Sequence, residues 1–190
     1  MKKILISGFM PFDQDLHNPS ANWIKWFLDE EKVKVQEGLL KGVILPVTFE
    51  GAFNELKLHI DSFKPEVIIM TGLAKNRTEL SLERIGINWV DFRIPDNVGM
   101  LVKAQKIDSL GPDGLFTTIP IDLLLSIDPA LKISTSAGEY VCNELLYRTL
   151  YYLQDTNTQV TFFHLPGEEN YKENYNNIFI RLKNLVRANE

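Results

Sequence analysis

The sequence contains a single cysteine, Cys142, so no disulfide can form within the chain. It also lacks any run of about 20 apolar residues, the length that a membrane-spanning helix requires. Lys2 and Lys3 precede an apolar start that is similar to a signal peptide, but Pro11 and Asp13 interrupt this segment before any cleavage site. These absences predict a protein of a reducing compartment, which we take to be the cytoplasm, without a membrane partner.

The negative net charge and the lack of cofactor-binding motifs exclude further classes of partner. The net charge of −5 offers no basic surface for nucleic acid. The sequence has no zinc-ligand spacing, no phosphate-binding loop and no Gly-x-Gly-x-x-Gly fingerprint. We therefore expect no metal, no nucleotide cofactor and no nucleic-acid partner.

What the chain does contain is enough apolar residues, 45% of its 190, to fill one core, so we expect a single domain over residues 1–190. Short β-rich segments alternate with longer segments of helical period, which predicts an α/β fold with a largely parallel sheet. The strands are expected at residues 3–7, 43–47, 66–71, 132–135 and 159–164. Asn18 and Pro19 are typical of a helix start, and helices are expected at residues 19–30, 49–63, 138–153 and 171–186. The segment 93–119 is expected to form a long functional loop.

Several segments should converge on one edge of this sheet. In parallel α/β sheets, ligands bind beyond the carboxyl ends of the strands. Residues 8–12 follow the first strand, Gly72 follows the third, residues 136–138 follow the strand before the cysteine helix, and residues 164–166 follow the last strand. We expect these four segments to face one cleft.

Cys142 has two interpretations. It lies in the expected first turn of a helix, where unpaired N–H groups and the helix dipole stabilise a thiolate and lower the thiol pKa. It also forms a helical stripe with Leu146, Leu150 and Leu153, which suits a small buried hydrophobic residue. Taken alone, the cysteine favours the second interpretation.

His164 and Glu83 are the matching acid–base candidates. His164 ends an apolar strand at the expected ligand edge, which suits a general base and equally suits a structural hydrogen-bonded residue. Glu83 lies in a β-like segment, from which it could orient the histidine. The alternative for Glu83 is a surface ion pair with Arg84, which for an isolated pair is the better interpretation.

Taken together, these segments resemble the pyroglutamyl peptidase I family of cysteine peptidases along nearly the whole chain. The matching motifs are, in chain order, Gly8-Phe9-Met10-Pro11-Phe12, Asn18-Pro19-Ser20, Leu45-Pro46-Val47, Gly72-Leu73-Ala74, Glu83-Arg84-Ile85-Gly86-Ile87-Asn88, Asp91-Phe92-Arg93-Ile94-Pro95-Asp96-Asn97, Gly111-Pro112, Ser134-Thr135-Ser136-Ala137-Gly138-Glu139-Tyr140-Val141-Cys142-Asn143 and Phe163-His164-Leu165-Pro166. The resemblance implies that Cys142 is the nucleophile, His164 its base and Glu83 the orienting acid. It also implies a three-layer α/β/α sandwich around a mostly parallel, mixed and twisted sheet, and often a homotetramer.

The reaction that the resemblance implies is hydrolysis of N-terminal pyroglutamate (5-oxoproline) from peptides through a thioester acyl-enzyme. The oxyanion would be held by the backbone N–H of Cys142 and, by resemblance, by Arg93. A neutral, flat lactam calls for apolar pocket walls. The candidates for these walls are Phe9 and Phe12 by their chemistry, and Ile94, Tyr140 and Val141 by resemblance.

Three residues depart from the family pattern beside the expected site: Lys75 replaces a small residue, Gly86 an alanine and Glu139 a threonine. Two other functions stay open. One is a divergent, catalytically weak protein of the same fold that binds pyroglutamyl peptides. The other is a nucleoside phosphorylase-like enzyme of similar architecture, although that reading leaves the cysteine motif unexplained.

Overall fold

A computed structural model of the chain describes residues 1–171 and 174–189. Within these ranges the main sheet has six strands in the order β2-β1-β3-β8-β4-β7. Their bounds are Leu40–Leu45 for β2, Ile4–Phe9 for β1, Val67–Leu73 for β3, Gln159–Leu165 for β8, Ser81–Glu83 for β4 and Lys132–Ser134 for β7. Neighbouring strands run parallel except β4, which is antiparallel to β8. The predicted mostly parallel, mixed sheet is confirmed.

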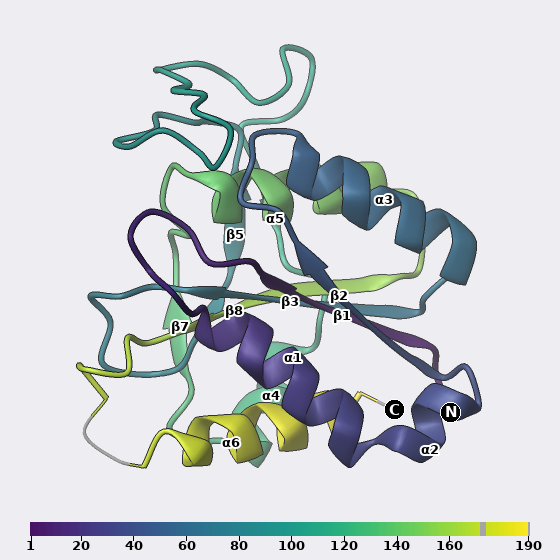
Figure 1. Cartoon of the computed structure of the whole chain (residues 1–190). Helices are drawn as coiled ribbons and strands as arrows, with labels where there is room; N and C mark the ends of the chain where they lie inside the picture. The colour runs from purple at the N-terminus through teal and green to yellow at the C-terminus, as the bar shows by residue number, and fades with distance from the viewer. Residues whose placement is uncertain (172–173, 190) are drawn as a thin grey trace.

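Helices cover both faces of this sheet, as Figure 1 shows. One face packs against α3 (Gly51–Phe63) and α5 (Val141–Tyr152). The other packs against α1 (Pro19–Glu30), α4 (Ile121–Ile127) and α6 (Asn176–Arg187), with α2 (Lys32–Gln36) following α1. The predicted α/β/α sandwich is therefore confirmed. None of the helices in the described ranges combines the length and apolarity needed to cross a membrane.

The start of α1 shows how local sequence sets an element boundary. The Asn18 side chain accepts a hydrogen bond from the Ser20 N–H at 3.1 Å, and Pro19 occupies the first helical position. The buried rings of Trp23 and Phe27 then stack at 5.2 Å between centroids, which fixes the apolar face of the helix. The predicted range 19–30 is confirmed.

Other elements differ from the prediction. The β-like segment before residue 88 divides into β4 and β5 (Ile85–Ile87), and β5 pairs with β6 (Gly114–Phe116) in a separate two-stranded sheet. The expected loop 93–119 therefore contains a strand, and α2 and α4 are too short to show a clear helical period in the sequence. The predicted helix 171–186 begins at Asn176, and residues 172–173 lie outside the described residues. Tyr171 and Tyr175 precede it, and their rings pack edge-on against each other and against the core on this face of the sheet.

Candidate active site

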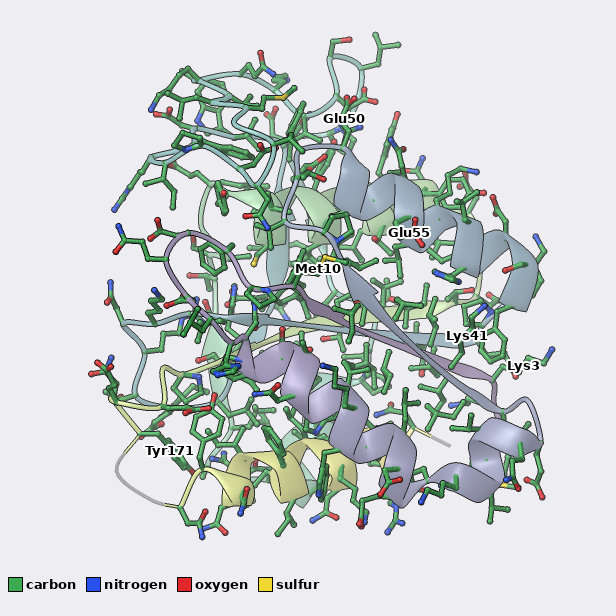
Figure 2. The ribbon with its side chains drawn as sticks, viewed as in Figure 1. Lys3, Met10, Lys41, Glu50, Glu55 and Tyr171 are labelled. Carbon is green, nitrogen blue, oxygen red and sulfur yellow. The ribbon has the colours of Figure 1, made fainter. Side chains whose placement is uncertain are left out.

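A cavity of about 290 Å³ lies at the carboxyl edge of the sheet. Phe9 and Phe12 reach it from β1 and the loop after it, and Leu73 reaches it from the end of β3. Residues 136–138 and His164 also line this cavity. The expectation that segments at the carboxyl ends of the strands face one cleft is therefore confirmed. Met10, labelled in Figure 2, lies in the loop after β1, and its carbonyl accepts a hydrogen bond from Asn18 Nδ2 at 3.1 Å.

Cys142 is the second residue of α5 and lies half-buried against this cavity. The N–H groups of a helix's first turn have no intrahelical acceptor, so they point toward the space in front of the helix. Asn143 anchors this turn, because its side chain accepts from the Ile87 N–H and donates to the carbonyls of Ile87 and Trp89, each at 2.9 Å. The cysteine backbone is thereby fixed against β5.

The protonation state of Cys142 differs from the sequence-based expectation. Burial first, and then the charge of Glu83, raise the pKa of the Cys142 thiol to about 12. Arg77 and the backbone N–H of Cys142 itself lower the pKa, but by less than burial raises it. The expected low pKa is therefore wrong for the free protein, because desolvation outweighs the helix terminus. A thiol in this state needs a base to remove its proton before it can attack.

His164 and Glu83 form a buried pair across two neighbouring strands. His164 Nδ1 lies 2.7 Å from Glu83 Oε1, and β4 runs antiparallel to β8 at this point. Glu83 is fully buried and His164 is 4% exposed. The alternative of a surface pair with Arg84 is wrong, because the exposed Arg84 instead places its guanidinium over the Phe116 ring.

The charges of this pair can be assigned from its surroundings. Burial raises the pKa of Glu83, but hydrogen bonding from His164 and Ser134, together with the charge of Arg77, outweighs this and holds it below its usual value. Burial, together with the charge of Arg77, lowers the pKa of His164 by more than Glu83 raises it. The carboxylate is therefore ionised and the imidazole neutral near pH 7. An ionised carboxylate only accepts, so Nδ1 carries the proton and Nε2 is free to accept one.

Gly72 brings the sulfur and the histidine strand together. It pairs in register with His164 across β3 and β8. A Cβ atom built on Gly72 would lie 3.0 Å from Cys142 Sγ and 2.8 Å from the Phe162 ring. The sulfur therefore sits directly over the backbone beside His164, in space that only a glycine leaves open.

We expect Gly72→Ala to lower kcat/KM by about 10² or more, because a displacement of about 1 Å at a reacting atom can cost that much. The matched control is Gly42→Ala in β2, where the added methyl meets the end of the flexible Leu28 side chain at 2.7 Å and Ile24 Cγ2 at 3.0 Å, away from the cavity. Activity on a fluorogenic substrate and thermal unfolding would be measured for both. Full activity in a stable Gly72→Ala protein would contradict the close approach of the sulfur.

The aromatic candidates for the pocket do meet at the cavity. Phe9, Phe12, Tyr140 and Val141 all line it. The rings of Phe12 and Tyr140 are 6.3 Å apart between centroids, and Phe9 is almost fully buried. Their faces give the cavity a mainly apolar wall.

Arg93 and Ile94 are placed differently. Both side chains are exposed, and neither is among the residues that line the cavity. Their loop nevertheless touches the rim, because the Tyr140 hydroxyl donates to the Pro95 carbonyl at 3.0 Å. The oxyanion role of Arg93 and the pocket role of Ile94 stay predictions.

Arg77 is a site residue that the sequence-based reasoning did not single out. It lines the cavity, and its Nη1 lies 2.6 Å from Glu83 Oε1. In the sequence it stood only inside an apparent glycosylation sequon, Asn76-Arg77-Thr78. The available signal was its positive charge in a segment that leads into a candidate buried carboxylate.

The three departures from the family pattern lie around the site. Lys75 makes an ion pair with Asp15 at 2.6 Å, and its Nζ is 5.9 Å from the centroid of the Phe12 ring. Gly86 packs closely on α5, since an added Cβ would lie 2.9 Å from the Tyr147 backbone nitrogen. Glu139 is exposed. Lys75 thus lies beside Phe12, a side chain that lines the cavity.

A thiol, a neutral imidazole and a buried carboxylate at one cleft of an α/β sandwich are the parts of a cysteine hydrolase. Comparison with known families narrows this class. The profile of the pyroglutamyl peptidase family matches residues 2–171, and the chain therefore belongs to this family.

Individual relatives agree with this assignment. The pyrrolidone-carboxylate peptidase of Aliivibrio fischeri is 38% identical over 170 residues, which cover 87% of this chain and 79% of the relative. The enzyme of the same name from Thermococcus litoralis is 35% identical, covering 87% of this chain and 77% of the relative. The solved structure of the T. litoralis peptidase superposes with a TM-score of 0.88 at 29% identity, covering 99% of this chain and 93% of that one. Pyroglutamyl peptidase I from Bacillus amyloliquefaciens gives 0.86 at 27% identity, covering 98% and 94%.

Proposed function

We propose that this protein is a cysteine omega-peptidase that removes N-terminal pyroglutamate from peptides, with Cys142 as nucleophile, His164 as base and Glu83 as orienting acid. The observation that carries the proposal is the apolar cavity that ends at Cys142 and His164, with Glu83 behind the histidine at 2.7 Å. The family membership supports the same reaction. Release of a fluorophore from a pyroglutamyl amide is the direct test, and no release by the pure protein would refute it.

The first half of the reaction is acylation. His164 Nε2 takes the proton from the Cys142 thiol while the sulfur attacks the carbonyl carbon of the pyroglutamyl residue. The negative charge that develops on the carbonyl oxygen is stabilised by the backbone N–H of Cys142, with Arg93 as the proposed second donor. Glu83 stabilises the imidazolium that forms. The tetrahedral intermediate then collapses, the C–N bond breaks, and His164 returns its proton to the departing amine.

The second half is deacylation. After the amine product has departed, a thioester joins Cys142 Sγ to the pyroglutamyl carbonyl carbon. His164, neutral again, removes a proton from a water molecule that attacks this carbonyl. Collapse of the second intermediate breaks the C–S bond, and the thiolate takes the proton from His164. Free pyroglutamate and the resting thiol–imidazole pair are the result.

The cavity also accounts for a preference for a blocked terminus. A pyroglutamyl residue has no free amino group, so it brings no charge into the site. The aromatic walls formed by Phe9, Phe12 and Tyr140 offer flat apolar surface to the lactam ring. The lining residues include no Asp or Glu that would pair with a substrate ammonium group. A peptide with N-terminal glutamine would therefore bury an uncompensated charge.

We expect the ratio of kcat/KM for matched pyroglutamyl and glutaminyl substrates to exceed about 10². An unpaired buried charge costs several kcal/mol, and about 1.4 kcal/mol corresponds to a factor of ten in rate. Both substrates would be measured in one buffer with the same leaving group. Equal values would mean that the reaction class is right and the assignment of the pocket is wrong.

The same assays distinguish the two rival functions from hydrolysis. A binding protein without activity would bind pyroglutamyl peptides but release no product. A phosphorylase-like enzyme would require inorganic phosphate, whereas thioester hydrolysis does not.

The single domain, the homotetramer and the cytoplasmic location stay predictions. Light scattering on the purified protein would test the tetramer.

A further inference from the structure

We infer that Arg77 is a positioning residue that holds Glu83 ionised and in place behind His164 and ties this pair to the segment leading into Cys142. The inference rests on the proposed function. Arg77 follows β3, and its N–H donates to the Ala74 carbonyl at 2.9 Å, which closes a turn. The side chain then extends into the site, where it contacts Glu83 on one side and the segment before Cys142 on the other.

The first half of the contact is at the carboxylate. Arg77 Nη1 lies 2.6 Å from Glu83 Oε1, the same oxygen that accepts the His164 Nδ1 proton at 2.7 Å. The Glu83 side chain is fully buried, whereas 26% of the Arg77 side chain is exposed. A buried carboxylate requires a compensating charge. Because His164 is neutral at rest, Arg77 provides the permanent positive charge among the ion pairs to Glu83 in the described ranges.

The second half of the contact is at the cysteine segment. Arg77 Nη2 donates to Ser134 Oγ at 3.2 Å and to the Ser136 carbonyl at 3.0 Å. Ser136 lines the cavity and lies just before Gly138, whose φ of +83° turns the chain into α5. A guanidinium can make these contacts simultaneously because its donors form a planar fork, and a lysine ammonium cannot reproduce that geometry. Arg77 therefore joins the histidine side of the site to the cysteine side.

The charge of Arg77 acts on all three catalytic groups in the same direction. It lowers the pKa of Glu83, of His164 and of Cys142. The groups that act on His164 are Glu83 and Arg77, and they oppose each other. Removing the positive charge would make the imidazolium easier to form in the free enzyme. The pKa of His164 would then rise, and a larger fraction of the base would be protonated on the acid side of neutrality.

The test compares Arg77→Gln, Arg77→Lys and the control Arg84→Gln, which makes the same change at the exposed residue next to Glu83. The rate profile with pH would be measured for a pyroglutamyl fluorogenic amide. We expect Arg77→Gln to lower kcat at least about tenfold and to move the acid limb of kcat/KM to higher pH. Arg77→Lys should keep the acid limb near its original position while losing rate, because charge is retained and the fork is lost. Arg84→Gln should match the wild type in both respects.

A second readout needs no turnover. The imidazole protons of His164 can be titrated by NMR in the wild type and in Arg77→Gln, with thermal unfolding measured alongside. We expect the His164 midpoint to rise in the variant. An unmoved midpoint and acid limb, with any loss of rate matched by loss of stability, would reduce Arg77 to a structural residue and overturn the inference. Absence of activity in the wild type would instead refute the proposed function, and the NMR titration would still decide the role of Arg77.

Discussion

Cys142→Ser is expected to abolish hydrolysis of pyroglutamyl amides, with a loss of kcat/KM of at least about 10³. A serine hydroxyl is far less acidic than a thiol, and the site is already one in which burial raises the pKa of Cys142 to about 12. The hydroxyl is smaller than the sulfur that packs over Gly72, so the fold should be preserved. Kinetics and circular dichroism on the same preparation would separate loss of chemistry from loss of structure.

Alkylation provides an independent check on this assignment. Cys142 is the only cysteine in the chain, so iodoacetamide can modify no other thiol. The raised thiol pKa predicts that inactivation of the free enzyme speeds up as the pH increases, because the thiolate fraction grows. Peptide mapping would locate the adduct. Near-normal hydrolysis by pure Cys142→Ser protein would remove the nucleophile role.

The elements that the sequence predicts well are those with a repeated or local signal. The start of α1 is one case, since Asn18 and Pro19 mark the boundary by hydrogen bonding and fixed backbone geometry that need no distant partner. The division of the segment around Glu83 into β4 and β5 is the opposite case. Each strand has three residues, and their pairing with β7 and β6 depends on segments far along the chain. No local pattern of that length distinguishes one strand from two.

Some features of the site could likewise be predicted from the sequence, and others could not. Cys142, His164 and Glu83 could be named because motifs in a known order surround each of them. The protonation state of the thiol could not be predicted, because it depends on how much burial opposes the helix terminus. The role of Arg77 was also hidden, since its contacts to Glu83 and Ser136 join three separate segments. Burial and long-range pairing are properties of the folded chain.

His164→Ala should be about as damaging as the loss of the cysteine. The thiol is protonated in the free protein, so removal of its proton and protonation of the leaving amine both depend on the imidazole. Residues that act as a unit show similar losses when either one is removed. The double variant with Cys142→Ser should therefore be little worse than either single variant. The measurement is kcat/KM for all three proteins under one set of conditions.

Glu83→Gln should be damaging but leave measurable activity, because the amide oxygen can still accept the His164 Nδ1 proton although it no longer balances the charge of the imidazolium. His17→Ala and His59→Ala are the matched controls. His17 is exposed beside a second cavity, and His59 lies on α3 with its Nε2 3.3 Å from Glu55. Both should retain wild-type kinetics. If a folded control variant lost activity while His164→Ala kept it, the base would have to be sought elsewhere, and the hydrogen bond between His164 and Glu83 would then serve only the fold.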